Sequence, residues 1–156
     1  MGGIRALVCL AIIAVILTGC AHLKKTGTDA QISSFCYQHS GMHTGLIYTY
    51  NLQKENEGYT AYYELNGGQM LFSVPVDADF AAELKRIVDE NNLYAWDGFD
   101  EAPYDVLDGE SFTLRIEFED GTKIRACGSN SYPKGYQEAY GEIQAVFERY
   151  SGLAEQ

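Results

Sequence analysis

Three segments in the first half of the chain alternate apolar and polar residues, and this period of two constrains the fold more than any other feature. They cover residues 46–52, 59–65 and 70–76. Successive side chains of a β-strand point to opposite faces, so each segment is predicted to be a strand with one buried face. Gly67 and Gly68 favour a two-residue type I′ turn between the last two strands, because glycine tolerates positive φ angles. Such a turn pairs Leu65 with Met70, Tyr63 with Phe72 and Ala61 with Val74.

A second hairpin is predicted from the strands at residues 112–118 and 124–128. A two-residue Asp120-Gly121 loop would place Phe118 opposite Lys123 and mix the apolar and polar faces, which strand register does not allow. A three-residue loop that begins at Glu119 and ends with a left-handed Gly121 avoids this conflict. It pairs Ile116 with Ile124 and Glu117 with Lys123.

Two amphipathic helices are predicted, one after each hairpin. Asp77 or Asp79 is suited to cap the first helix, and Asn91-Asn92 to end it. The second helix is predicted from Pro133 or Gly135 to residue 150. The apolar stripes of the two helices consist of Phe80, Leu84, Ile87 and Val88, and of Tyr136, Tyr140, Ile143, Phe147 and Tyr150.

The predicted fold class is α+β. The expected order is strand-strand-strand-helix-strand-strand-helix, with an antiparallel sheet of about five strands and both helices packed on one face. A shift of 56 residues places the first helix stripe on the second. The domain therefore consists of two ββα halves, or the match reflects the common hairpin-then-helix arrangement.

An apolar run of thirteen residues, 6–18, follows Arg5 and ends in Leu17-Thr18-Gly19-Cys20. A spanning helix needs about 20 apolar residues, so the run has the length of a signal-peptide core. The four-residue ending resembles a bacterial lipobox. The resemblance implies a signal peptide over 1–19, a lipidated Cys20 that holds the chain to the cell membrane or outer membrane, and an extracytoplasmic location. Residues 20–34 are then expected to form a flexible stalk, and residues 35–152 a single domain.

The formal charge of −11 excludes a basic footprint for nucleic acid. Contact is therefore expected with the membrane through the lipid, and with a protein or glycan partner. No cofactor motif is present in the sequence, and no cofactor is expected. Tyr62, Tyr104 and Tyr132 lie outside the apolar stripes and are candidates for a glycan- or peptide-binding surface.

The segment 96–110 contains six acids and no base. Its candidate site residues are Trp96, Asp97, Asp100, Glu101, Tyr104, Asp105 and Asp108. Carboxylates can bind Ca²⁺ or a cationic partner, but the spacing does not match an EF-hand loop. A solvated loop whose aromatic residues pack at the edge of the core is the third interpretation.

Two cysteines remain after Cys9 leaves with the leader and Cys20 is modified. Cys36 and Cys127 can form a disulfide in an exported protein, or stay reduced. Together with His39 and His43 they also form a zinc-competent set, although the spacing matches no established zinc motif.

Several short motifs in residues 93–150 resemble a module of small secreted or lipidated bacterial proteins of unknown function. They are Trp96-Asp97-Gly98-Phe99, Val106-Leu107-Asp108-Gly109, Ser111-Phe112-Thr113-Leu114, Asp120-Gly121, Gly128-Ser129-Asn130 and Tyr132-Pro133. The motifs are turns and core positions, so the resemblance implies a fold and no catalytic residue.

The sequence therefore predicts a membrane-anchored extracytoplasmic lipoprotein with a binding or structural accessory role. Two alternatives remain open at this point. One is an inhibitor or immunity-type lipoprotein that uses the acidic segment 96–110, and the other is a hydrolase of an envelope polymer.

Overall fold

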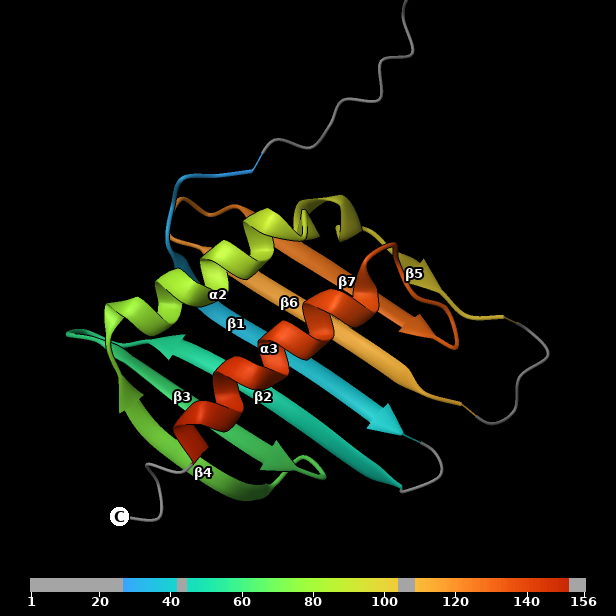
Figure 1. The fold of residues 1–156 in the computed structure, drawn as a ribbon, viewed down its shortest axis with the longest axis horizontal. Coiled ribbons are helices and arrows are strands. Elements are labelled where there is room, and N and C mark those ends of the chain that lie inside the picture. Colours follow the sequence, from blue (N-terminus) through green and yellow to red (C-terminus); the bar gives the residue numbers. More distant parts are fainter. Residues whose placement is uncertain (1–26, 42–44, 104–108, 152–156) are drawn as a thin grey trace, which may run out of the picture.

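A computed structural model describes residues 27–41, 45–103 and 109–151 of the chain. These residues form one sheet with strand order β4-β3-β2-β1-β6-β7-β5 (Figure 1). Its neighbouring strands are antiparallel except β5, which runs parallel to β7. The strands are β1 (Ile32–Gly41), β2 (Leu46–Lys54), β3 (Tyr59–Leu65), β4 (Gln69–Val76), β5 (Asp100–Glu101), β6 (Ser111–Phe118) and β7 (Lys123–Ser129). The helices are α2 (Ala78–Glu90), the 3₁₀ turn η1 (Leu93–Trp96) and α3 (Tyr136–Ser151).

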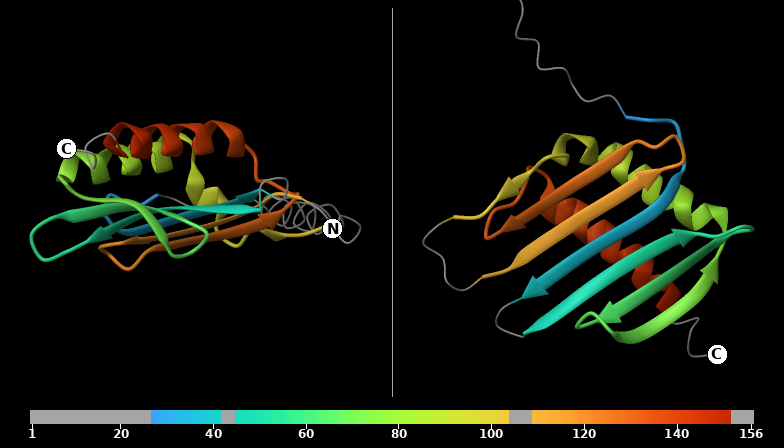
Figure 2. Two further views of the ribbon diagram at one scale, coloured as in Figure 1. Left: turned by 90° about the horizontal axis from the view of Figure 1, so that it is seen from below. Right: turned by 180° about the vertical axis from the view of Figure 1, so that it is seen from behind.

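The domain has two layers, with α2 and α3 side by side on one face of the sheet (Figure 2). The other face carries no helix of the described chain. The α+β class and the placement of both helices on one face agree with the sequence analysis. The expected number of strands is wrong, because the sheet has seven strands rather than about five. The two unpredicted strands are β1 and β5.

Strand β1 lies in the middle of the sheet, between β2 and β6. It begins at Ile32, so the expected boundary between a stalk at 20–34 and a domain from residue 35 is too late. The residues just before β1 also contact the domain. Thr28 Oγ1 donates a hydrogen bond to Asp120 Oδ2 (2.5 Å), and the Glu119 amide donates to the Gln31 carbonyl (2.9 Å).

The β6–β7 hairpin confirms the three-residue loop. Ile116 pairs with Ile124 and Glu117 pairs with Lys123. Gly121 has a φ of +85°, and its amide donates to the Phe118 carbonyl (2.9 Å).

The β3–β4 hairpin is only partly as predicted. Tyr63 pairs with Phe72 and Ala61 with Val74, but Leu65 pairs with Gln69 rather than Met70. The loop has three residues, 66–68. Asn66 (φ +54°) and Gly67 (φ +67°) both take left-handed conformations in it. A register shift after Tyr63 restores the pairing of the apolar rows, and it leaves Met70 exposed.

The helices start and end where the sequence indicates. Asp77 caps α2, because its Oδ1 accepts a hydrogen bond from the Phe80 amide (3.2 Å). Asn91 closes its C-terminal end through a bond from its Nδ2 to the Ile87 carbonyl (3.1 Å). The two hairpin-plus-helix units, β3-β4-α2 and β6-β7-α3, contribute hairpins on either side of the sheet, separated by β2 and β1.

The two ends of β1 have different surroundings. Its first residue, Ile32, lies beside Phe118 and the β6–β7 turn. Its far end lies beside the start of β2, where His39 pairs with Tyr48. The chain enters the domain at the first of these ends (Figure 1).

Candidate functional site

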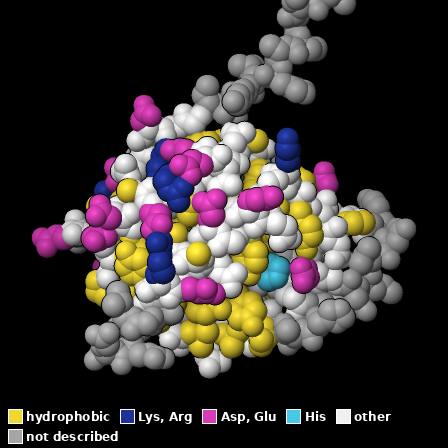
Figure 3. Space-filling model, viewed as in Figure 1, with side chains coloured by type: hydrophobic (Ala, Val, Ile, Leu, Met, Phe, Trp, Pro, Cys, Tyr) yellow, Lys and Arg dark blue, Asp and Glu magenta, His cyan; other side chains and the backbone are white. Residues whose placement is uncertain are grey.

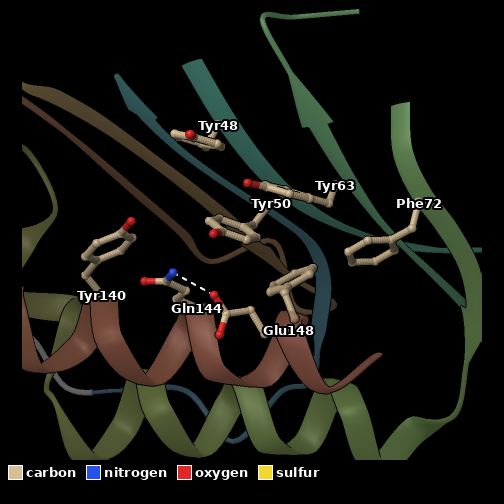
Figure 4. Close-up of a pocket in the computed structure, with 8 residues that line it drawn as sticks. Tyr48, Tyr50, Tyr63, Phe72, Tyr140, Gln144 and Glu148 are labelled. Carbon is tan, nitrogen blue, oxygen red and sulfur yellow. Dashed lines mark hydrogen bonds between the residues drawn. The ribbon is translucent and has the colours of Figure 1, made fainter. Parts of the chain in front are cut away.

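A pocket of about 390 Å³ lies between α3 and the strands β2, β3 and β4 (Figure 4). Its size falls within the range of small-molecule sites in proteins. The lining residues are Tyr48, Tyr50, Tyr63, Phe72, Tyr140, Gln144, Phe147 and Glu148. On the surface, hydrophobic side chains gather beside α3 over β2 and β3 (Figure 3).

The strands place three of these rings side by side. Tyr50 pairs with Tyr63, and Tyr63 pairs with Phe72, so all three lie in one row on the helix-facing side of the sheet. The ring centroids of Tyr50 and Tyr63 are 4.7 Å apart, and those of Tyr63 and Phe72 are 5.8 Å apart. Tyr48 stacks on Tyr63 at 6.1 Å. The row forms the sheet side of the pocket.

Helix α3 supplies the other side. Tyr140, Gln144 and Glu148 follow one another at intervals of four residues, which places them on one face of the helix. Phe147 is fully buried against Phe35 and Tyr50 and closes the floor. Tyr50 and Phe72 of the row are buried, whereas Tyr63 and the neighbouring Tyr48 are half-buried, so the pocket is open to solvent on the side of Tyr48 and Tyr63.

The polar atoms of the pocket are neutral hydroxyls and one amide–carboxylate pair. The hydroxyl ends of Tyr50, Tyr63 and Tyr140 point toward the space between the strands and the helix (Figure 4). Burial raises the pKa of each of these phenols above its usual value, so they stay protonated at neutral pH. Gln144 Nε2 donates a hydrogen bond to Glu148 Oε1 (2.7 Å).

Tyr140 is held in place by its other neighbours. Its ring stacks on Tyr37 at 5.3 Å and on His39 at 5.2 Å. The Tyr37 and Tyr136 hydroxyls share a hydrogen bond (2.5 Å), and Tyr136 Oη lies 3.4 Å from His39 Nδ1. Burial lowers the pKa of His39, which favours its neutral form. These contacts fix the ring of Tyr140 at the mouth of the pocket.

Trp96 and Asp97 of the acidic segment have structural roles. Trp96 is buried, with 3% of its surface exposed, and its Nε1 donates to the Lys134 carbonyl (3.2 Å). It is therefore a core residue rather than a partner contact. Asp97 Oδ1 accepts a hydrogen bond from the Arg125 amide (2.7 Å).

Asp100 and Glu101, the other two described acids among the candidate site residues, bind different groups. Asp100 Oδ1 accepts a bond from the Cys127 thiol (3.3 Å), and Glu101 Oε2 accepts one from the Ser131 hydroxyl (2.6 Å). Tyr104, Asp105 and Asp108 lie outside the described residues. Within the described part of the chain, no group of three or more His, Cys, Asp or Glu side chains could hold a metal ion.

Cys36 and Cys127 are both free thiols. Cys36 pairs with Arg115 on β6 and Cys127 with Thr113 on β6, so a whole strand separates them. Two strand spacings amount to about 9.6 Å, whereas the Cα atoms of a disulfide lie within about 7 Å of one another. The disulfide considered from the sequence is therefore not formed in this fold.

The zinc set is divided as well. Cys36 and His39 are three residues apart on β1, so their side chains point to opposite faces of the sheet. His43 lies outside the described residues.

The tyrosines selected from the sequence are not those of the pocket. Tyr62 alternates with Tyr63 and therefore lies on the helix-free face, whereas Tyr132 packs against Phe112 and Tyr136. Tyr104 is outside the described residues. The sequence feature that could have indicated the pocket is the presence of tyrosine, rather than leucine or valine, at core-facing positions. A buried hydroxyl requires a polar partner, so repeated tyrosines indicate an incompletely closed core.

Comparison with protein-family models, with curated proteins and with solved structures gave no match to this chain. None of the helices formed by the described residues is long and apolar enough to cross a membrane.

Proposed function

We propose that the chain is a lipid-tethered extracytoplasmic protein whose tyrosine-lined pocket binds a small ligand or one side chain of a partner. The observation that carries the proposal is the accessible pocket of about 390 Å³, formed by aromatic rings whose hydroxyls point inward. Aromatic walls with a few converging polar groups are typical of ligand sites. The lipobox-like ending at Cys20 supports the tether and the location.

The contacts made by the acidic segment favour this function over the two alternatives. Asp97, Asp100 and Glu101 accept hydrogen bonds from three separate groups of the domain itself. A hydrolase would need two carboxylates facing one reacting group, and an inhibitor would need acids presented to the partner. These three acids are used instead to hold η1 and β5 against β7 and the segment that follows it.

Binding is tested by screening sugars, amino acids and amines against the full chain in detergent micelles, with thermal shift and NMR as readouts. Gln144→Trp places a large ring at the pocket wall, and we expect it to abolish the response to any ligand of the pocket. Gln137→Trp is the matched control, because Gln137 is an exposed residue of the same helix and does not line the pocket. Equal responses of the two variants would contradict the proposal.

The tether is tested by metabolic labelling with a clickable fatty acid and by mass spectrometry of the amino terminus. We expect Cys20→Ser to lose the label and to leave the membrane fraction, and Cys9→Ser, which changes a cysteine of the predicted leader, to keep it. An intact amino terminus, or a mature chain whose Cys20 carries no acyl mass, would refute the lipid anchor.

A further inference from the structure

We infer that the ligand group taken by the tyrosine-lined pocket is an aliphatic ammonium, as in a lysine side chain or a free primary amine. The inference depends on the proposed function, since it names the chemistry of the ligand at the same site. Three observations carry it: the charge of the lining, the hydrogen-bond acceptors that the lining presents, and the aromatic walls.

Of the described residues that line the pocket, Glu148 is the one acid, and none is a lysine or an arginine. Burial raises the pKa of Tyr50, Tyr63 and Tyr140 most, and the nearby charge of Glu148 adds to it in the same direction. An anionic ligand of the pocket would lie beside this carboxylate.

The ring of His39 stacks on Tyr140 beside the pocket, and burial lowers the pKa of His39, which favours its neutral form. The overall charge of the chain also favours a cationic ligand. The formal charge of −11 on the chain attracts cations from solution and repels anions.

The polar groups of the pocket offer acceptors in the number that an ammonium needs. The Gln144 amide donates its Nε2 proton to Glu148 Oε1, so its carbonyl oxygen is directed away from Glu148 (Figure 4). The Gln144 carbonyl, the Glu148 carboxylate and the phenol oxygens are acceptors. A primary ammonium has three donors and no acceptor, so each of these kinds of group is a suitable partner for it.

The aromatic walls suit the rest of such a ligand. Tyr63 stacks between Tyr50 and Tyr48, so the rings present mainly their edges, and the methylene groups that carry the ammonium can pack against this apolar surface. A neutral sugar would find the apolar surface and the acceptors too, but it would gain nothing from the charge of Glu148. The dependence of binding on that charge separates the two ligand classes.

The experiment is an NMR titration of the full chain in detergent micelles with Nα-acetyl-lysine methylamide. Its Nε-acetylated analogue, which has the same stem without the charge, is titrated in parallel. We expect the amine to bind about tenfold more tightly than the acetylated analogue, as a lost charge-assisted hydrogen bond requires. Glu148→Gln should weaken amine binding by a similar factor, about tenfold.

Glu138→Gln is the charge-matched control, because Glu138 is an exposed acid in the first turn of the same helix and does not line the pocket. It should leave the affinity for the amine unchanged. Equal weakening by Glu138→Gln and Glu148→Gln would overturn the inference, because overall charge alone would then explain binding.

The outcomes separate the inference from the function on which it depends. If methyl glucoside binds in a manner sensitive to Gln144→Trp while the amine does not bind, the ammonium inference is wrong and the binding function stands. If no sugar, amino acid or amine perturbs the pocket, both are overturned. Amine binding that is lost in Glu148→Gln and in Gln144→Trp supports both.

Discussion

Two glycines of this domain illustrate how backbone conformation decides the effect of one residue. Gly121 has a φ of +85°, whereas Gly141 lies on the exposed side of α3 in a helical conformation. A Cβ added at either position would meet no atom within 4 Å. Any difference between substitutions at the two sites therefore comes from the backbone and not from packing.

We expect Gly121→Ala to lower the free energy of unfolding by about 1–2 kcal/mol, since a left-handed conformation is costly for residues with a Cβ. Gly121→Val should lower it further, because branching at Cβ adds to the strain. Gly141→Ala should raise it by roughly 0.5–1 kcal/mol, because glycine disfavours a helix interior. Urea unfolding followed by circular dichroism measures all three. A neutral Gly121→Ala would show that the β6–β7 turn is not under this constraint.

His39 gives the domain a pH dependence whose sign follows from its surroundings. Burial among Tyr140 and its neighbours lowers its pKa from the usual 6.5. The unfolded chain then binds a proton more readily than the folded one, so the stability that His39 contributes is present above pH 6.5 and is lost as the pH falls.

We expect the free energy of unfolding to fall between pH 7.5 and pH 5, and this fall to be smaller in His39→Gln. Guanidinium unfolding of both proteins at the two pH values provides the comparison. An identical pH dependence in the variant would mean that His39 is not responsible for it.

At the scale of elements, the sequence was most informative where one residue pattern determined the structure. The period of two in residues 59–65 and the alternative registers around Gly121 were sufficient to place β3 and the β6–β7 hairpin. Strand β1 was missed because a register shift between Ile32 and Ser34 breaks its alternation. Strand β5 has two residues and pairs with β7 across a long loop, so no local pattern could reveal it.

The pocket could be predicted only in part, for a different reason. Tyr50, Tyr63 and Tyr140 were all assigned to buried stripes, and they do face the interface between sheet and helix. Whether that interface is closed depends on where α3 crosses the sheet and how far β2 and β3 extend beyond it. The position of α3 on the sheet depends on its packing against α2, and a local sequence pattern does not predict such long-range packing.

Asp97 is one of several groups that attach η1 and β5 to β7. Asp97 Oδ1 accepts the Arg125 amide, and the Cys127 amide donates to the Phe99 carbonyl (2.9 Å). Asp97→Ala removes the acceptor, and we expect a loss of about 1–3 kcal/mol of unfolding free energy. Asp97→Asn keeps a carbonyl oxygen and should lose less. Hydrogen exchange should show faster exchange at the Arg125 amide in Asp97→Ala, and unchanged exchange there would contradict the assigned role.

In the whole molecule, the proposed anchor precedes the start of β1, and the proposed pocket lies beside its second half. Ile32 pairs with Phe118 near the β6–β7 turn, whereas Tyr50 and Tyr48 of the pocket pair with Tyr37 and His39. Five to seven residues of extended strand lie between these levels, a distance of roughly 17–23 Å. The sheet therefore holds the pocket at a fixed distance from the point where the chain enters the domain.

In a nanodisc that contains lipids with a paramagnetic headgroup, we expect the amide of Thr122 to relax faster than the amide of Gln69. Thr122 lies in the β6–β7 turn near the entry point, and Gln69 begins β4 at the turn that follows β3. Cys20→Ser should abolish the enhancement at both amides. Stronger relaxation at Gln69 than at Thr122 would reverse the expected orientation.

The distance between the entry point of the chain and the pocket has a consequence for the proposed lipid anchor. If Cys20 carries the lipid, a domain held at the Ile32 end would turn its tyrosines away from the headgroups. Amine-bearing polymers and exposed lysines of passing proteins would then reach the pocket more readily than the amino groups of the bilayer.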